Sequence, residues 1–231
     1  MKIISIITIL CALSTQAQIT WQNGAGPNKF ASGAGPDKFA IAGSSGGGGG
    51  GGGSFSDNFN RADGALGANW TCPSGATAFT IVSQQVQPGA EGFANNLDLW
   101  TGSSLTGNIS NSVVITGSII TSETYYGVVQ CDINGNGGYI WANNATAGLI
   151  LETFTGNAAG SLLQSDSTPV VSGTVLGMVV RSTGISCYTN GVLDFTYSTS
   201  ATTGLLPGIY FTGNHSAPSD TMDNAAGAGG F

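Results

Sequence analysis

The sequence predicts an all-β fold, a sandwich or a barrel, that begins after a run of glycine. Residues 54–231 are rich in Val, Ile, Thr, Tyr and Phe, and Gly and Asn separate their short apolar runs. These runs recur at near-regular spacing with turn residues between them, which is typical of sandwiches and barrels. No window of this region sustains the apolar period of an amphipathic helix. The region is long enough to enclose a hydrophobic core as one domain.

The N-terminal part divides into two segments of different character. Residues 1–17 are predicted to be a secretory signal peptide, because Lys2 precedes an apolar stretch and Thr15 and Ala17 are small residues at a cleavage position. Residues 18–53 are predicted to be a disordered, low-complexity arm, in which residues 24–31 recur at 33–40 with a nine-residue period. The arm ends in an unbroken glycine run, and polyglycine loses too much backbone entropy to become ordered alone. We therefore expect a secreted, extracellular chain whose folded domain spans 54–231.

Predicted strands occupy most of this domain. The clearest feature is a hairpin over 184–197, in which Asn190-Gly191 supplies the two positive φ angles of a type I′ turn. Alternation predicts that Leu193, Phe195 and Tyr197 share one face of the returning strand. The other predicted strands are 79–83, 112–121, 125–132, 138–141, 147–154, 174–181 and 208–212.

The charge balance excludes two classes of partner. Charged residues make up 7% of the chain, against roughly 25% in an average soluble protein, and the net charge is −7. After the arm only Arg61 and Arg181 are cationic, so no basic patch is available for nucleic acid or for an anionic membrane surface. No stretch after residue 17 is long and apolar enough to span a bilayer. We predict neither nucleic-acid binding nor membrane insertion.

Three cysteines remain after the signal peptide: Cys72, Cys131 and Cys187. Export permits disulfides, but an odd number allows at most one internal pair. The sequence leaves open which two would pair, and whether Cys131 and Cys187 are buried free thiols instead.

One segment carries a resemblance to a known family. Residues 56–70 read Ser-Asp-Asn-Phe-Asn-Arg-Ala-Asp-Gly-Ala-Leu-Gly-Ala-Asn-Trp. This phrase resembles the opening of bacterial and phage domains of the concanavalin A-like lectin/glucanase superfamily. The passages 139–163, 175–195 and 204–211 also resemble later parts of such domains, so the resemblance covers nearly all of 54–231 and none of the arm.

The resemblance implies a two-sheet antiparallel jelly-roll sandwich. It implies less about function, because this fold hosts lectins, glycosidases, adhesins and virion proteins. We interpret the opening phrase as structural: Phe59, Leu66 and Trp70 would anchor the core, and Arg61 and Asp63 would pair locally.

The carboxylates argue against catalysis. Retaining glycosidases need two carboxyl groups roughly 5–5.5 Å apart, and the glucanases that this chain resembles place two glutamates in Glu-x-Asp-x-x-Glu. The three glutamates here, Glu91, Glu123 and Glu152, stand far apart and form no such motif. The single His215 lies in a loop-like segment and gives no basis for a catalytic triad. We predict no enzyme, with a glycoside hydrolase as the distant alternative, and no organic cofactor.

A second pattern is a candidate calcium loop. Asp132, Asn134 and Asn136, followed by Gly137, match the first half of an oxygen-rich loop in which alternate side chains converge on a hard cation. Asn143 stands where such a loop needs a bidentate glutamate. The alternative is a plain hairpin turn made by the Asn-Gly pairs, which we favour.

Four aromatic residues are candidates for a sugar platform: Trp100, Tyr125, Tyr126 and Trp141. Sugar rings stack on exposed aromatic faces, although aromatics in sandwiches are usually core. Tyr125 and Tyr126 must point to opposite faces if they share a strand, which leaves one of them for the surface.

Two functions follow from these features. The first is a secreted, non-catalytic structural or adhesive component of an extracellular appendage, matrix or virion, which the low charge and the glycine-rich arm favour. The alternative is a lectin-like carbohydrate-binding module. The expected partner is accordingly a glycan or another copy of the chain.

Overall fold

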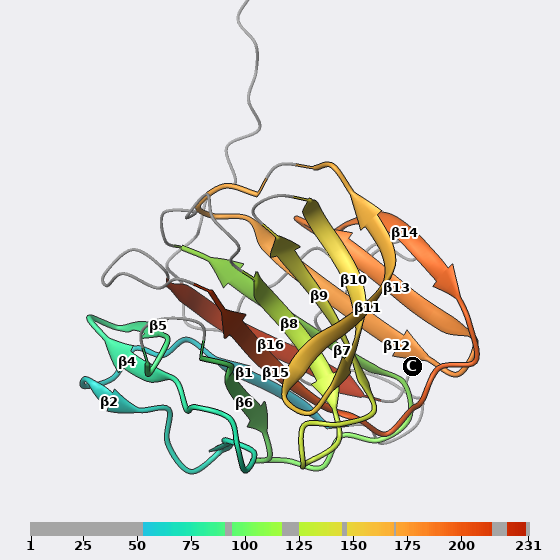
Figure 1. Ribbon diagram of the computed structural model, residues 1–231. Helices are drawn as coiled ribbons and strands as arrows, with labels where there is room; N and C mark the ends of the chain where they lie inside the picture. Colours follow the sequence, from blue (N-terminus) through green and yellow to red (C-terminus); the bar gives the residue numbers. More distant parts are fainter. Residues whose placement is uncertain are drawn as a thin grey trace, which may run out of the picture.

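The protein folds as two β-sheets packed face to face (Figure 1). The computed structural model describes residues 53–90, 94–116, 125–144, 147–168, 170–213 and 221–229. Within these ranges every helix or strand is a strand, and neighbouring strands run antiparallel, which confirms the predicted fold class. The described residues contain no helix long and apolar enough to cross a membrane. The predicted signal peptide and residues 18–52 of the arm lie outside the described residues.

Sheet A forms one layer. Its strands, in spatial order, are β14 (Val192–Ser198), β13 (Gly184–Thr189), β12 (Val175–Arg181), β7 (Ile109–Ile115), β16 (Met222–Gly229), β5 (Gln85–Gln87), β4 (Thr80–Val82) and β2 (Gly64–Ala65), and β1 (Ser54–Asp57) also pairs with β16.

Sheet B forms the other layer. Its strands, in spatial order, are β11 (Ala158–Asp166), β10 (Gly148–Thr155), β9 (Gly138–Asn144), β8 (Tyr125–Cys131), β15 (Leu206–Thr212), β6 (Asn96–Trp100) and β3 (Trp70–Thr71). In both sheets, strands that are distant in sequence lie side by side, as β6 and β15 do.

The main core lies between the sheets. Alternate residues of each strand turn inward, and Phe59 and Trp141 are fully buried there. A second cluster lies on the outer face of sheet B and includes Phe154 and Tyr210, whose rings meet edge to face at 5.0 Å. Sheet B is therefore apolar on both faces, which gives its central strands continuous apolar runs.

Two amides link the sheets through the main core. Asn111 of β7 donates from Nδ2 to the carbonyls of Val129 and Gly208 in sheet B, at 3.0 and 3.1 Å. Gln130 of β8 donates from Nε2 to the carbonyl of Ile109 and to Asn111 Oδ1, at 3.0 and 2.9 Å. Because buried amides are stable only when hydrogen-bonded, this pair fixes how the two sheets sit on each other.

The predicted hairpin is confirmed, with one correction. Asn190 and Gly191 have φ angles of 53° and 77° between β13 and β14. Phe195 and Tyr197 pack against the core as expected. A register shift at Asp194 pairs Leu193 with Tyr188. Because Tyr188 follows the inward-facing Cys187, Tyr188 and Leu193 lie on the face of sheet A that points away from the core. The bulge therefore breaks the predicted alternation at Leu193.

The three cysteines described are free thiols, and Cys131 and Cys187 are buried. This agrees with the alternative in which they are small core residues rather than a disulfide pair.

Candidate functional site

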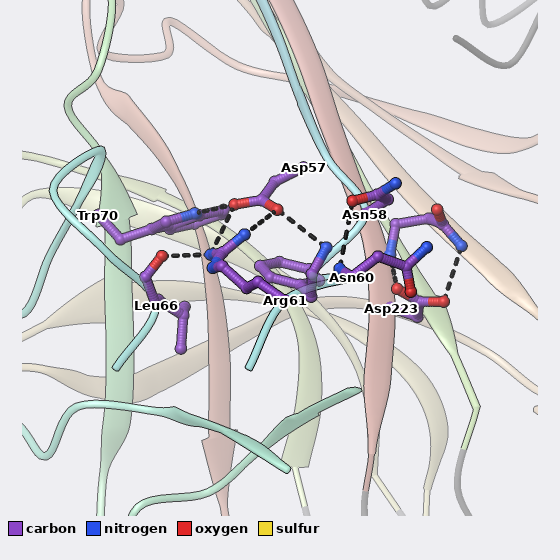
Figure 2. A network of polar contacts seen from close by, with 9 residues as sticks. Asp57, Asn58, Asn60, Arg61, Leu66, Trp70 and Asp223 are labelled. Atoms are coloured by element: carbon purple, nitrogen blue, oxygen red, sulfur yellow. Dashed lines mark hydrogen bonds and ion pairs between the residues drawn. The ribbon is translucent and has the colours of Figure 1, made fainter. Parts of the chain in front are cut away.

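The opening phrase forms a closed polar network (Figure 2). Asp57 accepts hydrogen bonds from Arg61 Nη1 at 2.7 Å and from the Trp70 indole at 2.8 Å. It also accepts the backbone N–H of Phe59, whose φ of 50° is strained for a bulky residue. Burial alone raises the pKa of Asp57, but the hydrogen bonds from Arg61, Trp70 and Phe59 outweigh it and hold the pKa below its ordinary value.

This network is an anchor for the core. Phe59, Leu66 and Trp70 are 0%, 4% and 7% exposed, as the sequence predicted. The predicted pairing of Arg61 with Asp63 is wrong: Arg61 reaches Asp57 and the Leu66 carbonyl, while Asp63 accepts the backbone N–H of Ser83. The Arg61 guanidinium, the Trp70 indole and the Phe59 N–H all donate within the phrase, so we assign it a structural role.

Three of the four predicted platform aromatics face the main core. Trp141 is 0% exposed, and its ring meets that of Phe195 edge to face. Trp100 is stacked on Phe55 at 4.6 Å, and Tyr126 is 5% exposed. These residues offer no free ring face to a sugar, which corrects the prediction for Trp100, Tyr126 and Trp141. Alternation in an inward-facing strand explains it.

Tyr125 is placed differently. It precedes Tyr126 in β8, so it lies on the opposite, outer face of sheet B, where it is half-buried. The register places it between Asn144 of β9 and Thr212 of β15. Tyr210 of β15 occupies the same face two residues further along the sheet in register, and Glu152 of β10 occupies it four residues along and two strands away from Tyr125. We call these five residues, Tyr125, Asn144, Glu152, Tyr210 and Thr212, the outer polar cluster.

Glu152 is the unusual member of the outer polar cluster. Its side chain is 7% exposed, and burial raises its pKa above the ordinary value. Among the described residues no hydrogen bond or ion pair reaches its carboxylate. The Glu152 oxygens are not among the buried side-chain atoms that lack a partner, so the carboxylate reaches solvent on this face and can accept a ligand's donors.

Of the other members, Tyr210 lies near this carboxylate, and Tyr125, Asn144 and Thr212 lie further along the same face. The Tyr210 hydroxyl donates to Asn95 Oδ1 at 2.8 Å. Burial raises the pKa of Tyr210 far above its ordinary value, and the nearby Tyr125 and Glu152 raise it further. Hydrogen bonds with Ala159 and Thr212 lower this pKa but do not offset the increase. Asn144 accepts the backbone N–H of Ala147 at 3.0 Å. Tyr210 is fully buried and Asn144 is 8% exposed, so Tyr125, Thr212 and the Glu152 carboxylate are the members that reach the surface.

The turn between β10 and β11 covers the other end of this face. Asn157 Nδ2 donates to the carbonyl of Ser74 at 2.9 Å, and the Asn157 N–H reaches the carbonyl of Gly135. Residues behind it, such as Phe154 and Cys131, are fully buried. The outer face of sheet B thus has a closed apolar end and a more polar end around Tyr125.

The predicted calcium loop is a compact turn. Asp132 Oδ1 accepts the backbone N–H groups of Asn134 and Asn136 at 2.8 and 2.9 Å. Asn136 Oδ1 accepts the N–H of Gly156. These side-chain oxygens are thus engaged within the protein, an arrangement typical of an Asx turn. Where the structure is described, no three His, Cys, Asp or Glu side chains gather as metal ligands.

Sequence reasoning identified Tyr125 but missed Tyr210, Thr212 and Asn144, and considered Glu152 only as a catalytic group. The available signal was the alternation of β8, because it assigns Tyr125 and Tyr126 to opposite faces. The pairing of β8 with β15, some eighty residues later in the chain, has no such local signal. Three other residues named in the sequence analysis, Glu91, Glu123 and His215, lie outside the described residues.

Comparison with known proteins identifies the fold. No family model and no curated protein matches this sequence. Among solved structures, the carbohydrate-binding module CBM66 from Bacillus subtilis is 13% identical, with a TM-score of 0.50 over 68% of this chain and 91% of that chain. The carbohydrate recognition domain of Emp46p is 6% identical, with a TM-score of 0.52 over 69% and 87%. The CBM2 module of the evolved Dit protein of Lactobacillus casei BL23 phage J-1 is 11% identical, with a TM-score of 0.50 over 76% and 95%.

At these identities the likeness concerns architecture. The described part of the chain has the two-sheet antiparallel jelly-roll fold that the resemblance of residues 56–70 implied.

Proposed function

We propose that this chain is a secreted, non-catalytic carbohydrate-binding protein and that the sugar contacts the outer polar cluster. The observation that carries the proposal is the Glu152 carboxylate, which reaches the surface from a largely buried side chain and has no donor among the described residues, on the same sheet face as the half-buried Tyr125. A sugar supplies hydroxyl donors for the carboxylate and an apolar ring face that packs against the exposed part of the tyrosine.

Charge narrows the ligand class. Residues 54–231 contain two arginines and eleven acidic residues, which gives 2 − 11 = −9. Glu152 would repel an anionic sugar within a site that already penalises charge. A neutral glycan therefore fits better than a uronic acid or a sulfated polymer.

The solved structures support this proposal by name. Two of the three reported are called carbohydrate-binding modules and one a carbohydrate recognition domain. Their sugars are not transferred to this chain, because the shared property is the fold.

The arrangement of carboxylates favours binding over hydrolysis. In the described part of sheet B, Glu152 is the one carboxyl on the outer face, since Asp98 pairs with the core residue Ile209 and Asp166 with the core residue Leu149. Hydrolysis of a glycoside ordinarily needs two carboxyls that flank the bond.

A panel of neutral polysaccharides tests the proposal. The purified chain should be retarded in gels that contain its ligand, and no reducing sugar should be released. Tyr125→Ala and Glu152→Gln should each weaken retention by roughly 10-fold or more, as expected for a lost ring contact or a lost charged acceptor. Asp63→Asn is the matched control, because it removes an exposed charge from a loop beside sheet A. Retention that is equal in all four proteins, or absent with every glycan, would contradict the proposal.

A structural or adhesive role in an appendage, matrix or virion is the second candidate. The charged fraction of 7% and the repeated, glycine-rich arm favour it. Concentration-dependent assembly of the purified chain, measured by light scattering, would support this role, and a monomer at all concentrations would exclude it.

Secretion is proposed from the predicted signal peptide at residues 1–17. N-terminal sequencing of protein recovered from the medium should begin near Gln18. An intact Lys2 in exported protein would contradict this cleavage.

A further inference from the structure

One side of the sandwich is closed by no strand. β11 ends sheet B and β14 ends sheet A, each pairs with a single neighbour, and the two strands contact each other. Figure 1 shows β14 at the free edge of its sheet. The layer between the sheets therefore reaches the surface here, along what we call the open side, lined by Tyr139, Leu163, Asp166, Asp194, Phe195 and Tyr197.

The open side is apolar. Tyr139, Leu163, Phe195 and Tyr197 pack against the main core but remain partly exposed. Val192, on the edge strand β14, is 67% exposed, whereas the 57% exposed Leu162 of β11 pairs with Glu152 and lies on the outer face of sheet B. Edge strands are commonly protected by lysine or proline, and neither β11 nor β14 contains one.

The open side also holds two acidic residues without a basic partner. Burial raises the pKa of Asp194, and a hydrogen bond from Thr189 partly offsets this increase. The charge of Asp166 also raises the pKa of Asp194, because the two carboxylates lie near each other. In the part of the chain that the structure describes, the ion pair found is Arg61–Asp57, so neither carboxylate is neutralised.

The complementary chemistry lies in the arm of the same chain. Residues 18–53 contain Lys29, Lys38 and Asp37, a net charge of +1, whereas residues 54–231 carry −9. Each lysine is followed directly by phenylalanine in the repeated Gly-Pro-x-Lys-Phe-Ala. The phenylalanine ring of each repeat complements the half-buried rings of the open side, and its lysine complements the two carboxylates beside them.

The arm is long enough to reach this side. The arm joins the sheet at β1, and β16, β7, β12 and β13 separate β1 from β14. Five strand spacings amount to roughly 24 Å. The register aligns Ser54 with Thr196 through Ala228, Ser110, Val179 and Ser186. Phe39 lies fifteen residues before Ser54, and a glycine-rich linker of that length has a root-mean-square span of roughly 21 Å.

We propose that the repeat containing Lys38 and Phe39 docks on the open side of its own sandwich, with Phe39 on the exposed rings and Lys38 between Asp166 and Asp194. Because the span of the linker matches the distance, the effective concentration of the tethered repeat is in the millimolar range, which favours the arm of the same molecule over that of a second copy. The docked arm covers the unprotected edges. It leaves the outer polar cluster, on another face of sheet B, open to ligand.

Carbodiimide cross-linking of the full chain, followed by peptide mass spectrometry, tests this inference. The reagent joins a lysine amine to a carboxylate that touches it. We expect Lys38 linked to Asp166 or Asp194 in the monomer band, with the yield reduced at least fivefold in Phe39→Ala and at high salt. Trypsin should cleave after Lys38 at least fivefold faster in Asp166→Asn/Asp194→Asn than in the parent.

The exposed Asp63 is the internal control for chance encounters. Equal yields of Lys38 links to Asp63 and to the open side would overturn the proposal, as would links confined to a dimer band, which would assign the arm to a second copy. Neither result bears on glycan binding, so the two proposals fail separately.

Discussion

Sheet B has a largely buried acidic side chain on each face, and the two differ in whether a hydrogen-bond donor contacts the carboxylate. Asp98, on the inner face, is 3% exposed and accepts the backbone N–H of Phe79 at 2.7 Å. Glu152, on the outer face, is 7% exposed and has no donor in the described structure. The side chains of Asp98 and Glu152 are buried to a similar extent, but among the described residues only Asp98 has a hydrogen-bond donor. We therefore regard Asp98 as structural and Glu152 as available to a ligand.

The amides follow the same division. On the inner side, Asn111 and Gln130 donate hydrogen bonds to the opposite sheet. Asn144 on the outer side is engaged locally, with Ala147. Inner polar groups therefore hold the two sheets together, while outer ones shape a surface.

The largest expected effect is loss of an inner anchor. Trp70→Ala removes a ring that contacts Phe55, Phe59 and Trp100 and takes one of its donors from the Asp57 carboxylate. It should lower the free energy of unfolding by about 3–5 kcal/mol. Urea unfolding measures this, and a change below about 1 kcal/mol would show that the phrase is not an anchor.

A matched pair of amides sharpens the comparison. Asn111→Ala should cost about 3 kcal/mol, because it removes two inter-sheet hydrogen bonds and leaves two buried carbonyls and Gln130 short of partners. Asn144→Ala should cost less, about 1 kcal/mol, since it removes the acceptor for the N–H of the exposed Ala147 and none of the described inter-sheet hydrogen bonds. Equal losses by urea unfolding would mean that the two faces do not differ in this way.

Asp98 makes stability depend on pH. Burial raises its pKa to about 7, against the hydrogen bond from Phe79. An unfolded aspartate titrates near pH 4, so between about pH 4 and 7 the folded state holds a proton that the unfolded state releases. Stability should therefore fall as pH rises through this window, by up to about 4 kcal/mol.

Asp98→Asn keeps an acceptor for Phe79 and removes the titration. The variant should lose this fall and exceed the parent in stability at pH 8, as urea unfolding at pH 4.5 and 8 would measure. An unchanged pH profile would show that Asp98 is not the group responsible.

The smallest expected effect concerns calcium. Because Asp132 and Asn136 use their oxygens within the turn, EDTA should leave the melting temperature unchanged to within about 1 °C. A drop that calcium reverses in the parent but not in Asp132→Ala would establish a metal site at this loop.

The sequence predicted those strands whose local composition is typical of strands. The hairpin at Asn190-Gly191 and the strand from Tyr125 were found in this way. β16 was missed because Met222–Gly229 is mostly Ala, Gly and Asn and contains no β-branched residue. It nevertheless lies in the middle of sheet A, where close packing against β7 and β1 suits small side chains.

The candidate site was less accessible from the sequence for a physical reason. Its residues lie on β8, β9, β10 and β15, and pairing between distant strands decides which of them share a face. Alternation within β8 singled out the tyrosine pair, but whether Tyr125 or Tyr126 faced outward depended on the register with β15. Trp100 and Trp141 were misjudged because ring chemistry does not reveal burial.

The most direct test measures binding and stability together in Glu152→Gln and Asp98→Asn. With a glycan that retards the parent, Glu152→Gln should reduce affinity roughly 10-fold and leave the melting temperature within about 2 °C. Asp98→Asn should bind as the parent does but change the stability at pH 8. Loss of binding in Asp98→Asn without unfolding, or normal binding in Glu152→Gln, would contradict the assignment of ligand binding to the outer face.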